Sequence, residues 1–351
     1  MSELVGLRIE APAVFDAVHD RVLALAAAGI ATGFRIDHID GLRDPESYLK
    51  RLRTKLAALR QPDFYIIVEK ILSGNERLPA NWPVEGTTGY DFLNAVNLLF
   101  TSRDGIEKLS QFYREITRSP DWQTVLYRSR CLVIRKLFAA EMTALKTRLW
   151  HLARKDRHAK DLPFDMLASA LFEVTASLPV YRTYTCTYPV RTPDRHYIGL
   201  TLERVLRRKP QLRPALTFLA QLLLPADWDY LPPTGREERL SFLCRWQQLT
   251  GAVTAKGLED TALYRYSPLL ALGEVGCTPG RTRGTSVAAF HARNQAILSR
   301  WPYTLNATST HDTKRSEDVR ARLSILSEIP ERSGRISLGR GSNTTAPGSQ
   351  W

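Results

Sequence analysis

The chain begins with an alternation of helix and strand patterns, and this order limits the folds that it can adopt. Apolar residues recur at helical spacing from Pro12 to Ala28 and again from Glu46 to Leu59. Short apolar runs typical of buried strands follow each pattern, at Gly33–Ile36 and Phe64–Val68. Strands joined through a helix pair in parallel, whereas antiparallel strands need only a short turn. We therefore expect residues 12–70 to form part of an α/β barrel or a doubly wound sheet.

A carboxylate follows each of these strands. Asp37 follows the first strand, Glu69 follows the second, and Asp312 follows a third strand that we expect just before it. Retaining cleavage of a glycosidic bond needs one carboxylate that attacks the anomeric carbon and one acid that protonates the leaving oxygen. A third acid, with Arg and His nearby, stabilises the positive charge of the transition state. Three acidic strand ends therefore indicate sugar chemistry on a barrel.

Taken singly, each acidic residue has a simpler interpretation. Asp37 can cap the next helix, although Asp44, which precedes a proline, suits that role better. Glu69 and Lys70 can belong to a surface ion pair, and Asp312 can form a loop hydrogen bond or begin a helix. Their joint occurrence at three strand ends favours the catalytic interpretation.

The rest of the chain divides by pattern into segments between and after these strands. Residues 72–92 are rich in Gly, Pro, Asn and aromatic residues, which predicts a substrate-facing loop or a packed surface loop. Residues 104–250 carry a helical pattern rich in Leu, Arg and Ala. Strand signals return at 251–255, ahead of a polar cluster around Lys256 that lines a site or forms a salt-bridge network.

We therefore expect an α/β fold, a partial (β/α)8 TIM barrel with a large helical insertion. Residues 1–100 would be the barrel part with the first two carboxylates, and 101–250 the helical insertion. Residues 251–332 would hold later barrel strands and the His-Asp motif. The segment 333–351 is rich in Gly, Ser and Thr without apolar periodicity, which predicts an unrelated, disordered tail.

The composition is that of a globular protein with a large core, since 44% of its 351 residues are hydrophobic. No run of 18 apolar residues and no signal-peptide pattern is present, so we expect a cytoplasmic protein without a membrane partner. The net charge of +13 raises a nucleic-acid hypothesis, but Arg is spread along the chain without a recognised nucleic-acid motif. The four cysteines form no CxxC pair, so neither a zinc site nor a disulfide framework is indicated.

Several sequence blocks together resemble the maltooligosyltrehalose synthase family of the α-amylase superfamily (glycoside hydrolase family 13). They are GFRIDHIDGLRDP (33–45), VEKILSGNERLP with EGTTGYDFLNAVN (68–97), TAKGLEDTALYRY (254–266) and TSTHDTKRSEDVRARL (308–323). The resemblance covers residues 4–332. It is specific, because the wider superfamily shares only the Arg-x-Asp, Glu and His-Asp kernels.

The resemblance implies roles for individual residues. Asp37 would be the nucleophile, Glu69 the general acid and base, and Asp312 the transition-state stabiliser. By the resemblance, Arg35, His38 and His311 would position the sugar. Apart from the resemblance, we expect substrate binding by Lys256 and Tyr90, and stacking on sugar rings by Trp82, Tyr90 and Tyr184. No metal and no organic cofactor is required.

The reaction implied by the resemblance is an intramolecular transglucosylation of a maltooligosaccharide, an α-1,4-glucan. Its reducing-end α-1,4 bond becomes an α,α-1,1 bond by a retaining double displacement. Family members carry further barrel strands before and after the matched part, so we expect an internal fragment with weak or no activity. The alternatives are a hydrolase or another transferase of the superfamily, and a non-catalytic fragment or basic nucleic-acid-binding protein. The oligomeric state is not indicated.

Overall fold

The structure is a computed structural model that describes residues 6–224, 228, 230–279 and 286–331, and the chain forms two compact units. The first unit comprises Met1–Thr88, Tyr127–Leu258 and Arg300–Leu305. The second comprises Gly89–Leu126, Glu259–Ser299 and Asn306–Trp351. The tail expected at 333–351 lies outside the described residues.

The first unit contains a sheet of three parallel strands in the order β1, β2, β3. The strands are β1 (Gly33–Ile36), β2 (Tyr65–Val68) and β3 (Gly86–Thr87), and Phe34 lies beside Ile66 in the register. The first two strands and their parallel pairing confirm the sequence prediction. The sequence gives no signal for β3, because its two residues lie in a Gly- and Thr-rich segment without alternation.

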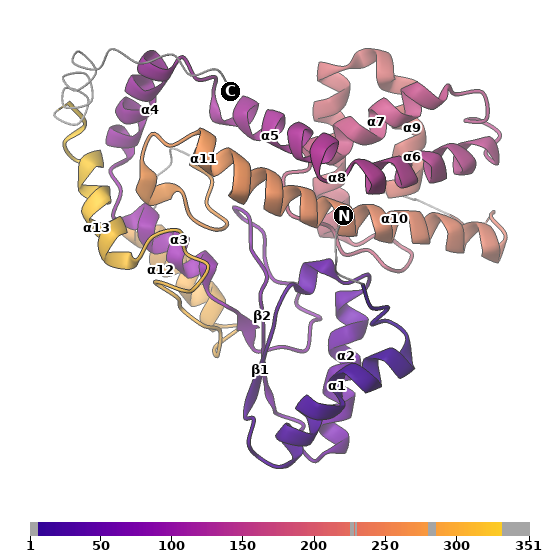
Figure 1. Ribbon diagram of the computed structural model, residues 1–351, viewed down its shortest axis with the longest axis horizontal. Helices are drawn as coiled ribbons and strands as arrows, with labels where there is room; N and C mark the ends of the chain where they lie inside the picture. The colour runs from indigo at the N-terminus through magenta and orange to yellow at the C-terminus, as the bar shows by residue number, and fades with distance from the viewer. Residues whose placement is uncertain (1–5, 225–227, 229, 280–285, 332–351) are drawn as a thin grey trace. The chain divides into compact units, whose positions relative to one another are not determined.

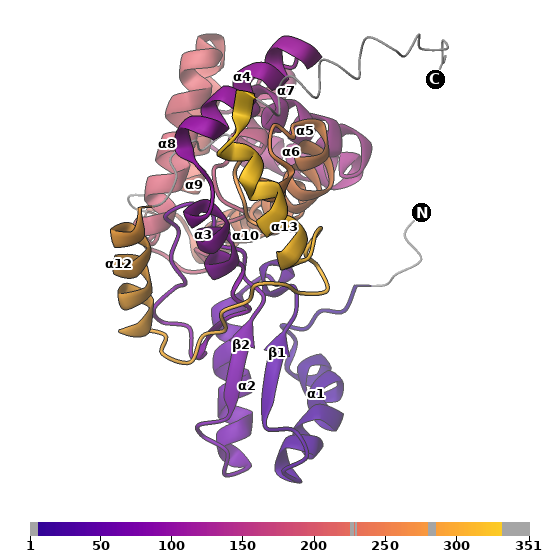
Figure 2. The same ribbon diagram turned by 90° about the vertical axis from the view of Figure 1, so that its left-hand side faces the viewer.

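Two helices pack beside these strands (Figure 1 and Figure 2), α1 (Pro12–Ala27) and α2 (Pro45–Ala58). Both were expected from their periodicity. The Asp44 side chain accepts the backbone N–H of Ser47 at 3.1 Å, so Asp44 caps α2 and Asp37 is left for another role. Burying one Leu in such a core contributes roughly 1.5–3 kcal/mol. The core between helices and strands includes Phe15, Leu49, Leu52, Leu56, Ile66 and Val68.

The helical region predicted after the strands is confirmed, because the described residues from Arg103 to Thr254 form helices and no strand. In the first unit, α7 packs against α6, α8, α9 and α10, and its Leu171 and Val174 are fully buried. The helices of this region are α4 (Arg103–Thr117), α5 (Trp122–Lys136), α6 (Ala139–Arg154), α7 (Phe164–Ser177), α8 (Thr192–Arg208), α9 (Arg213–Leu223) and α10 (Pro233–Thr254).

Residues 251–255 are helical, so the strand expected there is wrong. α10 continues through Thr254 and leads into a π-helix, Ala255–Ala262. A short run of small and β-branched residues suits a helix or a strand, and packing decides between them. Here Val253 is fully buried on a face of α10.

The regular secondary structure in the described part of the second unit is helical. Its core joins Ile106, Leu109, Leu269 and Leu272. The strand expected before His311 is wrong, because the described residues 306–310 have no regular secondary structure. Besides α4 the unit contains α3 (Tyr90–Leu99), α11 (Leu263–Arg265), α12 (Val287–Leu298) and α13 (Glu317–Ser324).

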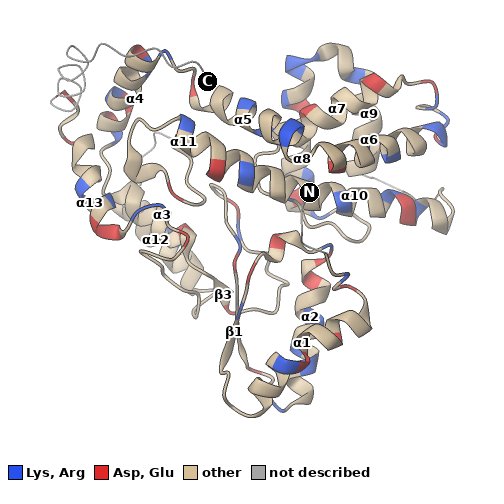
Figure 3. Cartoon of the chain, in the orientation of Figure 1, with Lys and Arg blue, Asp and Glu red and all other residues tan. Residues whose placement is uncertain are grey.

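Basic and acidic residues occur mixed along most helices (Figure 3). Lys155 pairs with Glu238 at 2.7 Å, and Arg208 pairs with Glu173. Part of the basic charge is therefore paired locally with acidic side chains. None of the helices in the described part of the chain is both long and apolar enough to span a membrane.

Candidate active site

Arg35 and Asp37 lie at the carboxyl end of β1. Arg35 Nη1 donates to Asp37 Oδ1 at 2.6 Å. Its Nη2 lies 3.7 Å from Oε1 of Glu69, which follows β2. One guanidinium thus contacts both carboxylates and offsets part of the repulsion between them.

His38 turns the chain after β1, and its backbone holds Glu69. With φ at 50° it adopts the left-handed conformation, which residues other than glycine seldom take. Its N–H donates to Glu69 Oε2 at 3.0 Å, and the N–H of Glu69 donates to the Ile36 carbonyl at 2.8 Å. These two hydrogen bonds fasten the end of β1 to the end of β2.

The carboxylates of Asp37 and Glu69 lie close together in different surroundings. A carboxylate oxygen of each residue and a ring nitrogen of His38 lie within 4.8 Å of one another. Retaining glycosidases separate their carboxyl groups by about 5–5.5 Å, and inverting ones by about 6.5–9.5 Å. The Asp37 side chain is 59% exposed, whereas that of Glu69 is 15% exposed. The spacing therefore suits a retaining pair.

The surroundings of Asp37 and Glu69 shift the pKa values of these two residues in opposite directions. Hydrogen bonding to Glu69, followed by the contact with Arg35, lowers the pKa of Asp37. Burial raises the pKa of Glu69, although the His38 N–H opposes this effect. A carboxylate pair with divergent pKa values can supply a charged nucleophile and a protonated acid at the same pH. Asp37 suits the first role and Glu69 the second.

Asp37, His38 and Glu69 also offer three possible ligand atoms for a metal ion. However, Arg35 already donates to Asp37, and the His38 N–H already donates to Glu69. A guanidinium at this distance repels a divalent cation. The cluster therefore fits a hydrogen-bonded carboxylate pair better than a metal centre.

Lys70, directly after Glu69, is a buried cation with two acidic partners. Its Nζ lies 2.9 Å from Glu76 and 3.4 Å from Asp40, and it donates to the Ile71 carbonyl at 2.8 Å. Burial by itself would lower the pKa of Lys70, but the carboxylates of Asp40 and Glu76 outweigh it and raise that pKa. Because the side chain is 0% exposed, the alternative of a surface ion pair between Glu69 and Lys70 is wrong.

Two residues between α7 and α8 bind the turn Ile39–Gly41, which contains Asp40. The Tyr184 hydroxyl donates to the Asp40 carboxylate. Arg182, which is 1% exposed, donates to the Asp40 carbonyl at 2.7 Å and to the Leu42 carbonyl. Sequence patterns give no signal for these contacts, because 142 residues separate Arg182 from Asp40.

The aromatic rings expected to stack on sugars are buried. Trp82 and Tyr184 are 2% and 9% exposed and pack edge to face, with 5.1 Å between their ring centroids. Tyr90, in the second unit, is 2% exposed. The stacking prediction is wrong for these three rings, because their apolar area is already packed against protein.

In the second unit, Asp312 lies beside Tyr90 and His311. The Tyr90 hydroxyl donates to Asp312 Oδ2 at 3.2 Å and contacts Thr310 Oγ1 at 2.9 Å. His311 Nε2 lies 3.2 Å from the same carboxylate, which is 43% exposed. Tyr90 thus holds Asp312 in place through its hydroxyl. Direct binding of a sugar by Tyr90 or His311 stays a prediction.

Lys256 lies in the π-helix Ala255–Ala262 with an exposed side chain. It belongs to the first unit, as Asp37 and Glu69 do. π-helical turns occur frequently at functional sites. Substrate binding by Lys256 stays a prediction.

Comparisons with known proteins concern the chain as a whole, and no protein-family model matches it. Two curated Mycobacterium tuberculosis proteins, from strains CDC 1551 / Oshkosh and H37Rv, are 36% identical to it over 330 residues and carry the name maltooligosyl trehalose synthase. The solved maltooligosyltrehalose synthase of Arthrobacter ramosus is 35% identical over 96% of the chain, with a TM-score of 0.80. By sequence and fold, the chain is homologous to the maltooligosyl trehalose synthases. The resemblance expected from its motifs is confirmed.

The chain spans less than half the length of the synthases that it matches. The match takes in 94% of this chain and 39% of the Mycobacterium tuberculosis synthases, and 40% of the Arthrobacter ramosus structure. A further solved structure, the DSM5389 glycosyltrehalose synthase, is 35% identical with a TM-score of 0.71, over 93% of this chain and 37% of its own.

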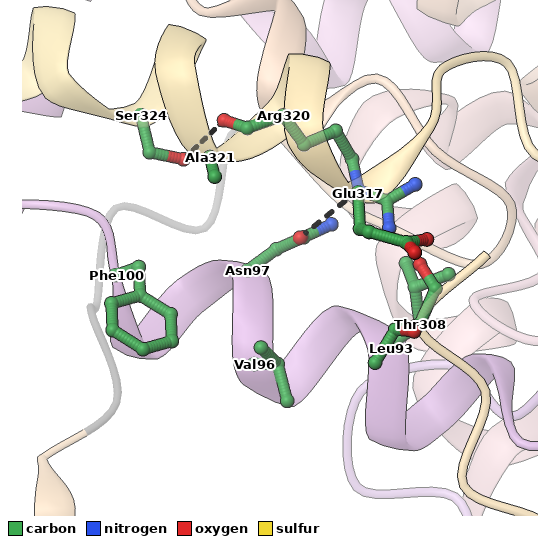
Figure 4. Close-up of a pocket in the computed structure, with 9 residues that line it drawn as sticks. All are labelled: Leu93, Val96, Asn97, Phe100, Thr308, Glu317, Arg320, Ala321 and Ser324. Atoms are coloured by element: carbon green, nitrogen blue, oxygen red, sulfur yellow. Dashed lines mark hydrogen bonds between the residues drawn. The ribbon is translucent and has the colours of Figure 1, made fainter.

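Two cavities occur in the described part of the chain, and neither is lined by Asp37, Glu69 or Asp312. One, of about 120 Å³, lies between α3 and α13 and is mainly apolar (Figure 4). There Arg320 Nε donates to Asn97 Oδ1 at 3.2 Å. The other, of about 700 Å³, lies in the first unit beside Tyr65 and Tyr303. Tyr65 begins β2, whereas Glu69 follows its last residue, so this cavity lies at the amino end of the strand.

Proposed function

We propose that this chain carries the catalytic carboxylates of a maltooligosyl trehalose synthase. The observation that supports this most is the Asp37–Glu69 pair, with its short separation and divergent pKa values. The proposed reaction converts the reducing-end α-1,4 bond of a maltooligosaccharide into an α,α-1,1 bond. It is an isomerisation by intramolecular glucosyl transfer, a step of trehalose biosynthesis.

In the first step, Asp37 attacks the anomeric carbon of the second glucose unit from the reducing end. The bond from that carbon to the glycosidic oxygen breaks while Glu69 gives its proton to the oxygen. The products are a covalent glycosyl ester on Asp37, a free glucose molecule and ionised Glu69. Arg35, which contacts both carboxylates, keeps Asp37 charged before the attack.

In the second step, the released glucose stays in the site and its anomeric hydroxyl attacks the same carbon. Glu69 accepts the hydroxyl proton, and the ester bond to Asp37 breaks. Two displacements return the original α configuration. Water must be kept from the ester, since its attack would produce hydrolysis.

Further residues complete the proposed site. Asp312, held by Tyr90, is the proposed stabiliser of the positively charged transition state. The proposed substrate-binding residues are Arg35, His38, His311, Lys256 and Tyr90.

We also propose that β1, β2 and β3 are successive strands of a (β/α)8 barrel. Their parallel order and the helix between β1 and β2 support this. In this arrangement residues 1–100 are a barrel part, 101–250 a helical insertion, and 251–332 the part with the His-Asp motif.

The test is product analysis with maltopentaose. Because the chain matches 39% of the Mycobacterium tuberculosis synthase, we expect weak or no activity of the chain alone. The reaction is therefore tested in a hybrid, in which the chain replaces the matching 330-residue segment of that synthase. There we expect reducing ends to disappear while the number of glucose units per product stays the same, with the Asp37→Asn variant as the inactive control. New reducing ends would indicate a hydrolase instead. A folded hybrid without product would contradict the proposal.

A further inference from the structure

We propose that Lys70 is a positioning residue, which holds the turn after β1 against the end of β2 and so places Asp37 beside Glu69. This inference rests on the proposed function only in taking these two carboxylates as the reacting groups. The placement itself is a structural property and can be measured without catalysis.

The Lys70 ammonium joins segments that the strands alone do not connect. Lys70 follows Glu69, so it belongs to the end of β2. Asp40, 3.4 Å away, lies in the 3₁₀ turn Ile39–Gly41 that continues from His38. Glu76, 2.9 Å away, lies in the loop after β2. One cation therefore ties the loop and the turn to the strand end that bears Glu69.

The other contacts of the turn come mainly from side chains. The Asp40 carbonyl accepts a hydrogen bond from Arg182. The Gly41 carbonyl accepts one from Gln248 Nε2 at 2.9 Å. The Asp40 carboxylate accepts from the Tyr184 hydroxyl. Because backbone groups in such a turn have no strand ladder to fix them, its position depends on these side-chain donors.

Removal of the ammonium would leave a buried and a partly buried acidic group without their shared cation. The Glu76 side chain is 6% exposed and that of Asp40 is 18% exposed. Unpaired buried charges are strongly unfavourable, and these two also repel each other. The expected response is movement of the turn toward solvent. The His38 N–H would then leave Glu69 Oε2, because His38 directly precedes the turn.

A matched control separates positioning from general stability. Arg239 in α10 pairs with Asp156 at 2.9 Å, and their side chains are 6% and 8% exposed. Its burial is similar to that of the Lys70–Glu76 pair, but it joins α10 to the segment after α6. Its loss should destabilise the first unit without a specific effect on His38.

The experiment measures hydrogen exchange of the His38 amide by NMR in the full chain labelled with ¹⁵N-histidine. The chain has seven His residues, and the His38 signal is the one that disappears in the His38→Gln variant. We expect Lys70→Met to accelerate this exchange about 10-fold or more relative to Arg239→Met. Equal protection of His38 in the two folded variants would overturn the proposal, whether or not the chain is active.

A milder variant covers the case in which Lys70→Met does not fold. Tyr184→Phe removes one donor to Asp40 and keeps every charge of the network. It should accelerate exchange of the His38 amide in the same direction by a smaller factor, and an unchanged rate would count against the proposal. Where turnover is measured, kcat of Lys70→Met should fall about 100-fold with little change in KM, as expected for misplaced reacting groups.

Discussion

The backbone N–H of His38 donates to Glu69 Oε2 at 3.0 Å, although 31 residues separate the two in the sequence. The donor belongs to the residue after Asp37, so this bond links the proposed acid to the turn that carries the proposed nucleophile. Because a main-chain group makes the bond, it does not depend on the imidazole. Substitution of His38 therefore tests the ring and leaves this link available.

The variants Asp37→Asn and Glu69→Gln should fail at different steps. The amide of Asp37→Asn is a poor nucleophile, so no covalent intermediate should form. Glu69→Gln should fail mainly at protonation of the leaving oxygen. A glycosyl fluoride substrate, whose leaving group needs little acid assistance, should restore fluoride release by Glu69→Gln and not by Asp37→Asn. Equal rescue of both variants would show that the roles are assigned wrongly.

The pH dependence of kcat should be bell-shaped, because the active form has Asp37 ionised and Glu69 protonated. The acid limb should lie below the ordinary Asp value, since the hydrogen bond to Glu69 lowers the pKa of Asp37, and the alkaline limb above the ordinary Glu value, since burial raises the pKa of Glu69. The two groups interact, so both limbs belong to the pair. An alkaline limb at or below the ordinary Glu value would contradict the proposed acid.

The same shifts affect stability with opposite signs. The contribution of Asp37 is present above its unfolded pKa and is lost as the pH falls through its lowered folded pKa. The contribution of Glu69 is present below its unfolded pKa and is lost as the pH rises through its raised folded pKa. Glu69→Gln should therefore not lose this stability as the pH rises above the ordinary Glu pKa, which thermal unfolding at several pH values would show.

Removal of the Tyr90 hydroxyl should release Asp312. Tyr90→Phe deletes the bonds to Asp312 and Thr310, which should cost about 0.5–1.5 kcal/mol of unfolding free energy. We also expect slower turnover, because Asp312 loses its fixed orientation. Tyr303→Phe is the control, since Tyr303 is 70% exposed. Similar losses in both variants, measured by urea unfolding, would argue against a specific role of Tyr90.

Local signals explain what the sequence predicts correctly. β1, β2 and the two helices beside them have clear periodicity, and Asp44 precedes Pro45 where α2 begins. The structure also places Asp37 and Glu69 directly after these strands, as the sequence predicts. Their catalytic roles stay a proposal.

Long-range packing explains what the sequence leaves open. The partners of Lys70 and the contact of Arg182 with the Asp40 turn depend on which helices meet the sheet. Trp82 and Tyr184 are residue types that can stack on sugar rings, but in this structure their rings pack against each other. A residue type alone does not tell whether its ring faces solvent or the core.

Gly105 should tolerate no side chain, although it lies in a helix. A Cβ at this position of α4 would stand 1.5 Å from the Ser327 carbonyl oxygen, a backbone atom that cannot turn aside. Elsewhere in a helix, replacing Gly by Ala is favourable by roughly 1 kcal/mol. Gly199 in α8 provides this comparison, since a Cβ there meets nothing within 4 Å. We expect Gly199→Ala to raise the unfolding midpoint and Gly105→Ala to lower it, at a cost of about 1–3 kcal/mol from overpacking. A Gly105→Ala variant as stable as Gly199→Ala would mean that α4 and the segment around Ser327 do not pack in this way.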